Sequence, residues 1–497
     1  MAQKSLKKHF ISLSKDSLVY GLGNAITAVT FFLAAPILTR KFSPADYGVI
    51  ALIASSIAFL NLFLIFGMDT ATTLTYYQEK KDQKGIVSGV LLFLTLWGLI
   101  LIGAAVIYSE EISELLFRTN TYRLPLIAAL ITAFLNLLIN FAKTVFRLEF
   151  KAKLFALVTA FNAIFSMGLA ILLIYLEKGI LGYFLGGLVG VFLSFIFALW
   201  LIREKFTLKI AWPRLKETIW HGAAIVPVSL AYFVFNLSNR FFISRFRSLE
   251  ELGLFAIAVN INSILTFFSV ALGRAWVPYV LKMHQDSKRT FNQFMPRIFT
   301  YFLIFFFCIA TLISIFRYEI LALFTTSKYF AAGEIIGILS FAIVCSATTQ
   351  VTSIGMYVAK KTKKLAFWAI ISAILNIILN LLLIPRFGMA GAAWATAATY
   401  LFLTLAYFFE SQRLIKLKYA WVKLINLTII SLLFIFFSPI FWRYGFYENL
   451  VIKVFEFALF FMLLYLLKVI EKNELKYLKS FTAKITSRFR NRGGNDH

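Results

Sequence analysis

The feature that most constrains this chain is the recurrence of long apolar runs from one end to the other. Each run has about the 20 residues that a helix needs to cross a hydrocarbon core of roughly 30 Å. Of the 497 residues, 60% are apolar and only 15% are charged, with a mean hydropathy of +0.82. This balance is outside the range of soluble domains. The sequence therefore predicts an all-α integral membrane protein.

Windows of about 19 residues place the spans and predict fourteen transmembrane helices. The first six are expected near residues 17–39, 47–68, 86–108, 124–143, 154–176 and 180–202. Six more, after a basic connector, are expected near residues 219–244, 253–273, 293–316, 332–357, 365–384 and 389–409. The last two are expected near residues 422–440 and 449–468. The opening run is too long for a signal peptide and counts as the first span.

The basic residues predict the orientation of these helices. The net charge is +27, and the charges lie in short loops between spans, which favours orientation in a membrane over nucleic-acid binding. When alternate loops are assigned to opposite sides, 37 of the 50 Lys and Arg residues fall on the side of both termini. Because cytoplasmic loops carry the excess, we expect a multi-pass inner-membrane protein with both termini in the cytoplasm.

Several kinds of chemistry have no signature in the sequence. The two cysteines, Cys308 and Cys345, lie in apolar spans without a ligand pattern, so neither a disulfide framework nor a metal site is expected. No phosphate-binding loop of the GxxxxGK[ST] type occurs, which argues against nucleotide hydrolysis. We expect no cofactor and no enzyme activity.

An internal repeat divides the predicted helices into two sets of six. Arg40 precedes Gly48 as Arg245 precedes Gly253, and Gly179 in EKGILGYFLGG matches Gly388 in RFGMAGAAWAT. The pattern predicts a first lobe over residues 1–210, a second over 211–412, two extra helices over 413–470 and a basic cytoplasmic tail over 471–497. Because six is an even number, the lobes share one orientation in the membrane.

Three stretches then carry a resemblance to a known family. The segments NIILNLLLIPRFGMAGAAWAT, LAAPILTRKFSPADYGVIALI and LSNRFFISRFRSLEELGLFAIAVNI resemble the polysaccharide transporter family of the multidrug/oligosaccharidyl-lipid/polysaccharide exporter superfamily. The resemblance covers about the first 410 residues. It implies two six-helix lobes in a V around a central cavity. It also implies a flippase for polyprenyl-linked sugars in O-antigen, lipopolysaccharide, capsule or peptidoglycan synthesis, whose partners include membrane lipids, glycosyltransferases and a glycan polymerase.

Polar stripes on four predicted helices supply the candidate substrate-binding residues. Polar faces of membrane helices point at one another or at water, so these stripes predict a wet cavity. The alternative is that each Asn bonds a neighbouring helix. The candidates on these stripes are Tyr20, Asn24, Asn136, Asn140, Lys143, Asn236, Asn239, Arg240, Asn376 and Asn380, and Arg274, at the cytoplasmic end of the eighth predicted span, is a further candidate.

Arg240 is the candidate on which most depends. An Arg fork could meet the phosphate of a lipid-linked sugar with charge-assisted hydrogen bonds. Two other readings remain: Arg240 lies close enough to the outer boundary to snorkel, and Lys143 and Arg274 lie at cytoplasmic ends where orientation alone explains them. Family members often have Asp-Arg where this chain has Asn239 and Arg240, so a charge pair is not expected here.

Other functions stay open at this point. Asp16 and Glu456 are candidates for ion coupling, and Lys453 is spaced to pair with Glu456. A lipid-linked peptidoglycan precursor is an alternative cargo. A cation-coupled multidrug exporter of the same fold would call for more buried acidic residues in the lobes. A membrane glycosyltransferase or polymerase would call for a large loop rich in acidic or His residues, which the chain lacks.

Overall fold

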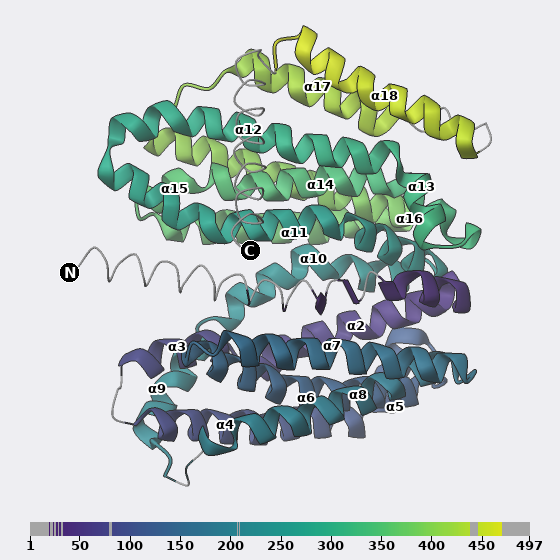
Figure 1. Ribbon diagram of the computed structural model, residues 1–497, viewed down its shortest axis with the longest axis vertical. Helices are drawn as coiled ribbons and strands as arrows, with labels where there is room; N and C mark the ends of the chain where they lie inside the picture. Colours follow the sequence, from purple (N-terminus) through teal and green to yellow (C-terminus); the bar gives the residue numbers. More distant parts are fainter. Residues whose placement is uncertain are drawn as a thin grey trace, which may run out of the picture. The chain divides into compact units, whose positions relative to one another are not determined.

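The computed structural model is helical throughout the part of the chain that it describes (Figure 1), which consists of residues 19, 23, 26, 27, 29, 30, 33–78, 82–205, 207, 209–437 and 446–469. The helices of the first half are α2 (Pro44–Ile65), α3 (Met68–Gln78), α4 (Gln83–Ile107), α5 (Ser109–Phe117), α6 (Arg123–Leu148), α7 (Ala152–Tyr175), α8 (Gly179–Ile202) and η1 (Arg203–Lys205). Next come α9 (Trp212–Ala223), α10 (Val226–Phe246), α11 (Leu249–Asp286), α12 (Lys288–Ile315), α13 (Arg317–Phe324), η2 (Ser327–Ala332), α14 (Gly333–Thr352) and α15 (Ile354–Val358). The last are α16 (Thr362–Leu414), α17 (Trp421–Phe437) and α18 (Phe446–Leu466).

The chain is a multi-pass membrane protein, and its helices lie over the second to fourteenth predicted spans, although α11 continues past the predicted end at residue 273. The first predicted span lies largely outside the described residues. Nine helices of the described residues are long and apolar enough to cross a bilayer. One of them, α16, contains Gly388 in a non-helical conformation and therefore corresponds to the two spans predicted near 365–384 and 389–409. The seventh predicted span is wrong at its start, because α10 begins at Val226 and Pro227 occupies its first turn. The residues before it form the separate helix α9.

Packing divides the chain into two compact units. Unit 1 comprises Met1–Ile257, Ala322–Ala331 and Ala373–Ala392, and unit 2 comprises the rest. The units follow packing and not the repeat, so the lobe boundary at residue 210 stays a prediction. The predicted tail, residues 471–497, lies outside the described residues.

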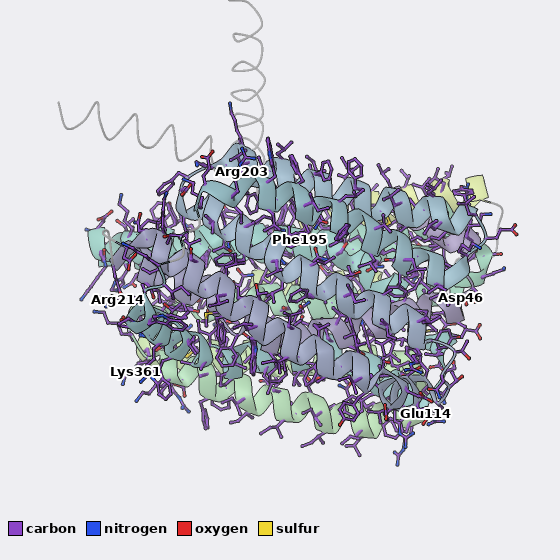
Figure 2. All side chains as sticks on the ribbon, turned by 90° about the horizontal axis from the view of Figure 1, so that it is seen from below. Asp46, Glu114, Phe195, Arg203, Arg214 and Lys361 are labelled. Atoms are coloured by element: carbon purple, nitrogen blue, oxygen red, sulfur yellow. The ribbon has the colours of Figure 1, made fainter. Side chains whose placement is uncertain are left out.

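Unit 1 is built on α6, α7 and α8, which pack along one another, with α4 against α6. The core between them is apolar, and Ile139, Phe146, Val158, Val191 and Ala198 are among its buried members. Figure 2 shows Arg203 and Arg214 toward one end of the unit, Asp46 and Glu114 toward the other, and Phe195 between them.

Unit 2 is organised around α12. This helix packs against α14 and α17, and α17 packs against α18. Aromatic residues fill much of the space, and Phe306 of α12 and Phe460 of α18 are fully buried. Thus α17 and α18, which follow the two sets of six predicted helices, belong to the hydrophobic core of unit 2.

The internal repeat is visible where α2 crosses the start of α11. A β-carbon on Gly48 would overlap the carbonyl oxygen of Leu249, and one on Gly253 would overlap that of Pro44. Gly48 and Gly253 are the glycines that the repeat pairs, and Pro44 and Leu249 are separated by the same 205 residues. The contact is therefore reciprocal, and it requires glycine on both sides.

A second reciprocal contact joins the first helix of each repeat to a short helix of the other. The Thr39 hydroxyl donates to the carbonyl oxygen of Phe324 at 3.1 Å, at the end of α13. The Ser244 hydroxyl of α10 donates to the carbonyl oxygen of Leu116 in α5 at 3.3 Å. Thr39 and Ser244 are again 205 residues apart. In both contacts, corresponding residues of the two predicted repeats thus have matching partners.

Candidate functional site

Arg240 of α10 contacts α2 within unit 1. Its Nη1 donates to the Ser55 hydroxyl at 3.0 Å, while Ser55 is fully buried and donates in turn to the Ala51 carbonyl. The Nε of Arg240 is buried without a hydrogen-bond partner, and no carboxylate forms an ion pair with the guanidinium among the residues that the structure describes. A cation placed in this way is costly unless an anion joins it.

Next to Arg240, α10 carries a buried polar cluster with α16. Asn380 Nδ2 donates to Asn239 Oδ1 at 2.8 Å and to Asn376 Oδ1 at 3.0 Å. Ser238 Oγ lies 3.2 Å from Asn376 Oδ1. All four side chains are buried. Asn239, Asn376 and Asn380 therefore form hydrogen bonds between neighbouring helices, which is the alternative to substrate binding. They could bind substrate only if these hydrogen bonds broke.

The polar stripe predicted on α10 divides between two directions. Asn239 faces α16, whereas Asn236 is exposed and Arg240 is half-buried against α2. Residues three or four positions apart lie on neighbouring parts of a helix surface, so one stripe can serve both directions. Asn236 and Arg240 are thus less buried than Asn239.

The candidates on α6 also divide. Asn162 of α7 donates to Asn136 Oδ1 at 3.0 Å, which is the helix-to-helix hydrogen bond of the alternative reading. On α6, Asn136 is therefore used in a hydrogen bond to α7, whereas Asn140 is exposed and Lys143 is partly exposed.

Four candidates lie outside what the structure describes. Asp16, Tyr20 and Asn24 belong to the residues of the predicted first span that are not described, and so does the side chain of Arg274. Their roles in substrate binding or ion coupling remain predictions.

The signature stretch around Gly388 has a structural role that the sequence pattern did not reveal. Gly388 has a φ of 56°, which places it in the left-handed region that favours glycine. The next amide, of Met389, donates to Glu251 of α11 at 3.0 Å, and Arg247 donates to the same carboxylate at 2.9 Å. Glu251 therefore caps the helix that resumes after the glycine, as acidic residues do at helix N-termini.

The predicted coupling residue Glu456 lies in a buried charged cluster of unit 2. Lys453 Nζ contacts both carboxylate oxygens of Glu319 in α13 at 2.7 Å, and both side chains are less than one-tenth exposed. Arg317 and Glu456 are buried as well. Sequence reasoning missed Glu319 because it lies 134 residues from Lys453 along the chain, in a short helix between two predicted spans.

A family model described as "Polysaccharide biosynthesis protein" matches residues 37–332, which is more than half of the chain. The chain belongs to this family. The matched range contains the Gly48 and Gly253 crossing, Ser55 and Arg240. It also contains α5 to α8, whose packing forms the core of unit 1.

Two proteins of Haemophilus influenzae are similar to this chain over most of their length. The chain is 24% identical over 387 residues to an uncharacterized membrane protein, covering 73% of this chain and 89% of that one. It is 26% identical over 293 residues to Lsg locus putative protein 1, covering 56% of this chain and 68% of the relative.

Solved structures share the fold at low sequence identity. The inward closed conformation of the lipid II flippase MurJ has a TM-score of 0.72 and 16% identity, covering 90% of this chain and 99% of that one. An inward-facing multidrug resistance MATE family transporter of the MOP superfamily has a TM-score of 0.63 and 14% identity, covering 79% and 97%. The fold expected from the resemblance is thereby confirmed, and it is one that transporters and flippases use.

Proposed function

We propose that this protein is a flippase that moves a polyprenyl-(di)phosphate-linked oligosaccharide from the cytoplasmic to the outer leaflet of the inner membrane by alternating access. Both termini lie in the cytoplasm in this proposal. The cargo belongs to cell-surface polysaccharide synthesis, of which O-antigen is one example. Membership of the polysaccharide biosynthesis family and the fold shared with flippases support this assignment.

The observation that carries the proposal is the guanidinium of Arg240. Its hydroxyl partner Ser55 offers no charge, and a cation inside a membrane protein calls for an anion. A phosphate or diphosphate supplies that anion only while the cargo is bound. Asn236, Asn140 and Lys143, which the packing leaves accessible, are proposed to meet the remaining phosphate and sugar groups.

The rival with the same fold is a cation-coupled exporter, which needs an acidic residue free to exchange ions. Of the three buried acids among the described residues, Glu319 and Glu410 are paired with Lys453 and Lys364, and the third is Glu456. This pairing favours the anion-binding reading over the exporter. Glu456 is kept as a candidate for coupling to an ion gradient.

The test uses the purified protein in proteoliposomes that contain a fluorescent polyprenyl-diphosphate oligosaccharide in the inner leaflet. Exposure of the glycan outside is measured with a lectin or an added glycosidase. A neutral polyprenyl glycoside of the same length is the matched control substrate. We expect fast exposure of the diphosphate lipid alone.

Three outcomes would contradict the proposal. Equal rates for both lipids would remove the role of the phosphate. Dye export driven by a sodium or proton gradient, without lipid movement, would identify the exporter. A lengthened glycan would identify a polymerase. A lipid-linked peptidoglycan precursor is tested in the same assay as a competitor, and its preference over the oligosaccharide would change the cargo.

A further inference from the structure

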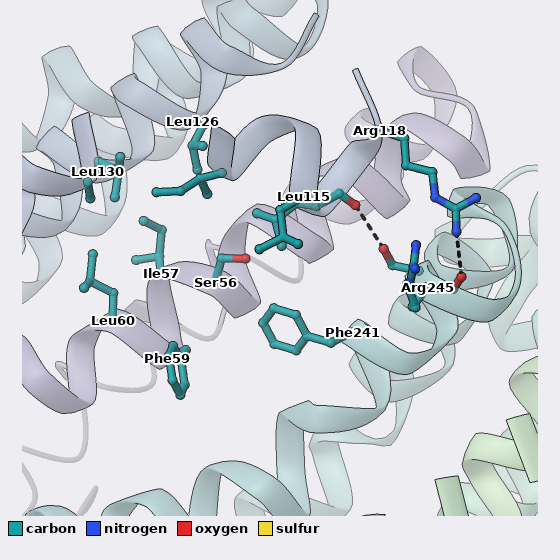
Figure 3. Close-up of a pocket in the computed structure, with 14 residues that line it drawn as sticks. Ser56, Ile57, Phe59, Leu60, Leu115, Arg118, Leu126, Leu130, Phe241 and Arg245 are labelled. Carbon is teal, nitrogen blue, oxygen red and sulfur yellow. Dashed lines mark hydrogen bonds between the residues drawn. The ribbon is translucent and has the colours of Figure 1, made fainter. Parts of the chain in front are cut away.

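Unit 1 contains a pocket of about 480 Å³ that has no part in the proposed transport site. It lies among α2, α4, α5, α6 and α10, and its walls are largely apolar (Figure 3). Pockets of roughly 300–1,000 Å³ are large enough for small organic ligands. Ser56 and Phe241 line the pocket, whereas their neighbours Ser55 and Arg240 bond each other. Adjacent residues point about 100° apart on a helix, so the pocket and the Arg240 contact use different faces.

One end of the pocket is basic. Arg118 and Arg245 both line it, and in Figure 3 they stand together at the end away from Leu60 and Leu130. Arg118 Nη2 donates to the Arg245 carbonyl at 3.1 Å, which holds the two residues side by side. Within the described ranges, no carboxylate forms an ion pair with either guanidinium.

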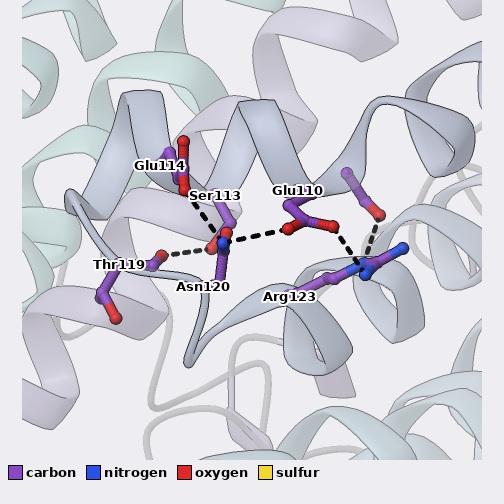
Figure 4. A network of polar contacts seen from close by, with 7 residues as sticks. Glu110, Ser113, Glu114, Thr119, Asn120 and Arg123 are labelled. Carbon is purple, nitrogen blue, oxygen red and sulfur yellow. Dashed lines mark hydrogen bonds and ion pairs between the residues drawn. The ribbon is translucent and has the colours of Figure 1, made fainter.

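Two of the three acidic residues of α5 have polar contacts elsewhere. Glu110 pairs with Arg123 at 2.9 Å, and Asn120 donates to both Glu110 and Glu114 (Figure 4). The apolar side of α5, with Ile112 and Leu115, lines the pocket. Glu110 and Glu114 thus make their polar contacts with Arg123 and Asn120, and not with the two arginines of the pocket.

We propose that this pocket binds an anionic glycerophospholipid, with its phosphate on Arg118 and Arg245 and one acyl chain among α2, α5 and α6. In the topology that the loop charges predict, α5 and Arg245 lie at the outer membrane surface, where a lipid headgroup would lie. Leu115 is 80% exposed, so an acyl chain can enter from the surrounding bilayer.

Charge and shape together select this occupant. An Arg pair meets a phosphate through charge-assisted hydrogen bonds, and apolar walls of this size match a hydrocarbon chain. A free phosphate would leave those walls unfilled. A bulk phospholipid is also far more concentrated in the bilayer than any scarce lipid carrier, which favours it by mass action. The bound lipid would tie α5 to α10 at their outer ends.

The experiment measures lipid retention by the full-length protein in detergent, by native mass spectrometry. Phosphatidylglycerol and phosphatidylcholine with identical acyl chains are added in equal amounts. Both lipids carry the phosphate, but the choline of phosphatidylcholine adds a positive charge that the two arginines repel. We therefore expect the wild type to retain phosphatidylglycerol about tenfold more than phosphatidylcholine. Arg118→Gln combined with Arg245→Gln should abolish the preference, and Lys at both positions should keep part of it.

Arg40→Gln is the matched control, because Arg40 is the repeat counterpart of Arg245, is exposed, and does not line the pocket. It should leave the preference unchanged. Ser56→Phe places a ring in the apolar part and should lower retention of both lipids while the arginines remain. Thermal melting of each variant in phosphatidylcholine micelles separates lost binding from lost folding.

Three results would overturn the proposal. Unchanged retention in the doubly substituted protein would show that the arginines do not hold the headgroup. Competition by inorganic phosphate at equal concentration would indicate a free-anion site. Displacement by a polyprenyl phosphate at lower concentration would indicate a carrier site. The outcome does not depend on transport, so the lipid site can stand or fall separately from the flippase.

Discussion

Replacing Arg240 by Met separates a transport role from a structural one. The substitution removes the hydrogen bond to Ser55, which contributes about 1 kcal/mol. It also removes the cost of holding a guanidinium away from water, which is several kcal/mol for a fully buried ion and less for this half-buried one. The two effects oppose each other. We therefore expect the melting temperature in detergent to stay the same or rise.

Transport should respond in the opposite direction. If Arg240 meets the phosphate with one or two charge-assisted hydrogen bonds of about 1.5–3 kcal/mol each, its loss should slow translocation at least tenfold. Arg240→Lys keeps the charge without the planar fork and should retain part of the rate. The measurement is lectin-detected translocation in proteoliposomes with matched amounts of folded protein.

Ser55→Ala is the control for this experiment. This substitution removes the acceptor of the Arg240 hydrogen bond but keeps the guanidinium of Arg240. Transport should therefore continue while stability falls slightly. The reasoning is refuted if Arg240→Met lowers the melting temperature and transport falls only in proportion to the folded fraction. Arg240 would then be a structural residue.

Four further predictions test the packing. Asn380→Ala should destabilise the protein by about 1–3 kcal/mol in chemical denaturation, because it removes two buried hydrogen bonds, and a Ser at the same position should cost less. Gly253→Ala should abolish folding or lock the protein in one conformation, because the added carbon meets a carbonyl oxygen, and wild-type melting and transport would contradict this. Lys453→Met alone should cost about 3–5 kcal/mol, whereas combining it with Glu319→Leu should recover much of the loss, as measured by melting. Burial would raise the pKa of Glu149, but hydrogen bonds from lysines on two segments outweigh burial and lower it. Its stabilising effect is therefore full above the unfolded value of about 4.3 and lost as the pH falls through the lower folded value, and Glu149→Gln should flatten that part of the stability profile.

Hydrophobic patterning predicted most of the fold. A membrane helix must satisfy its own backbone and present apolar side chains, so its position can be read from local sequence alone. The prediction fails where hydrophobicity and helix-start signals disagree. Apolar residues before Pro227 place the start of the seventh span near residue 219, but proline favours the first turn of a helix, and α10 begins at Val226.

The candidate site was less predictable, because a polar side chain in a membrane helix has two possible uses. Asn239 and Asn236 have the same chemistry, yet one bonds Asn380 and the other is exposed. The difference depends on which helix lies opposite, and that is a property of the tertiary fold. Ser55 was missed for the same reason, because a serine in an apolar run gives no sign of an arginine 185 residues away.

The crossing of Gly48 and Gly253 resembles the interface of a symmetric dimer. Each repeat places a glycine against a backbone carbonyl oxygen of the other repeat. In a symmetric dimer every substitution occurs twice. A fused chain has no such restriction, so each copy can change alone. The counterpart of Arg240 in the first copy is Ala35, 205 residues earlier. A second unpaired cation facing the first would repel it, so a chain with only one such arginine gains an asymmetry that two identical subunits could not have.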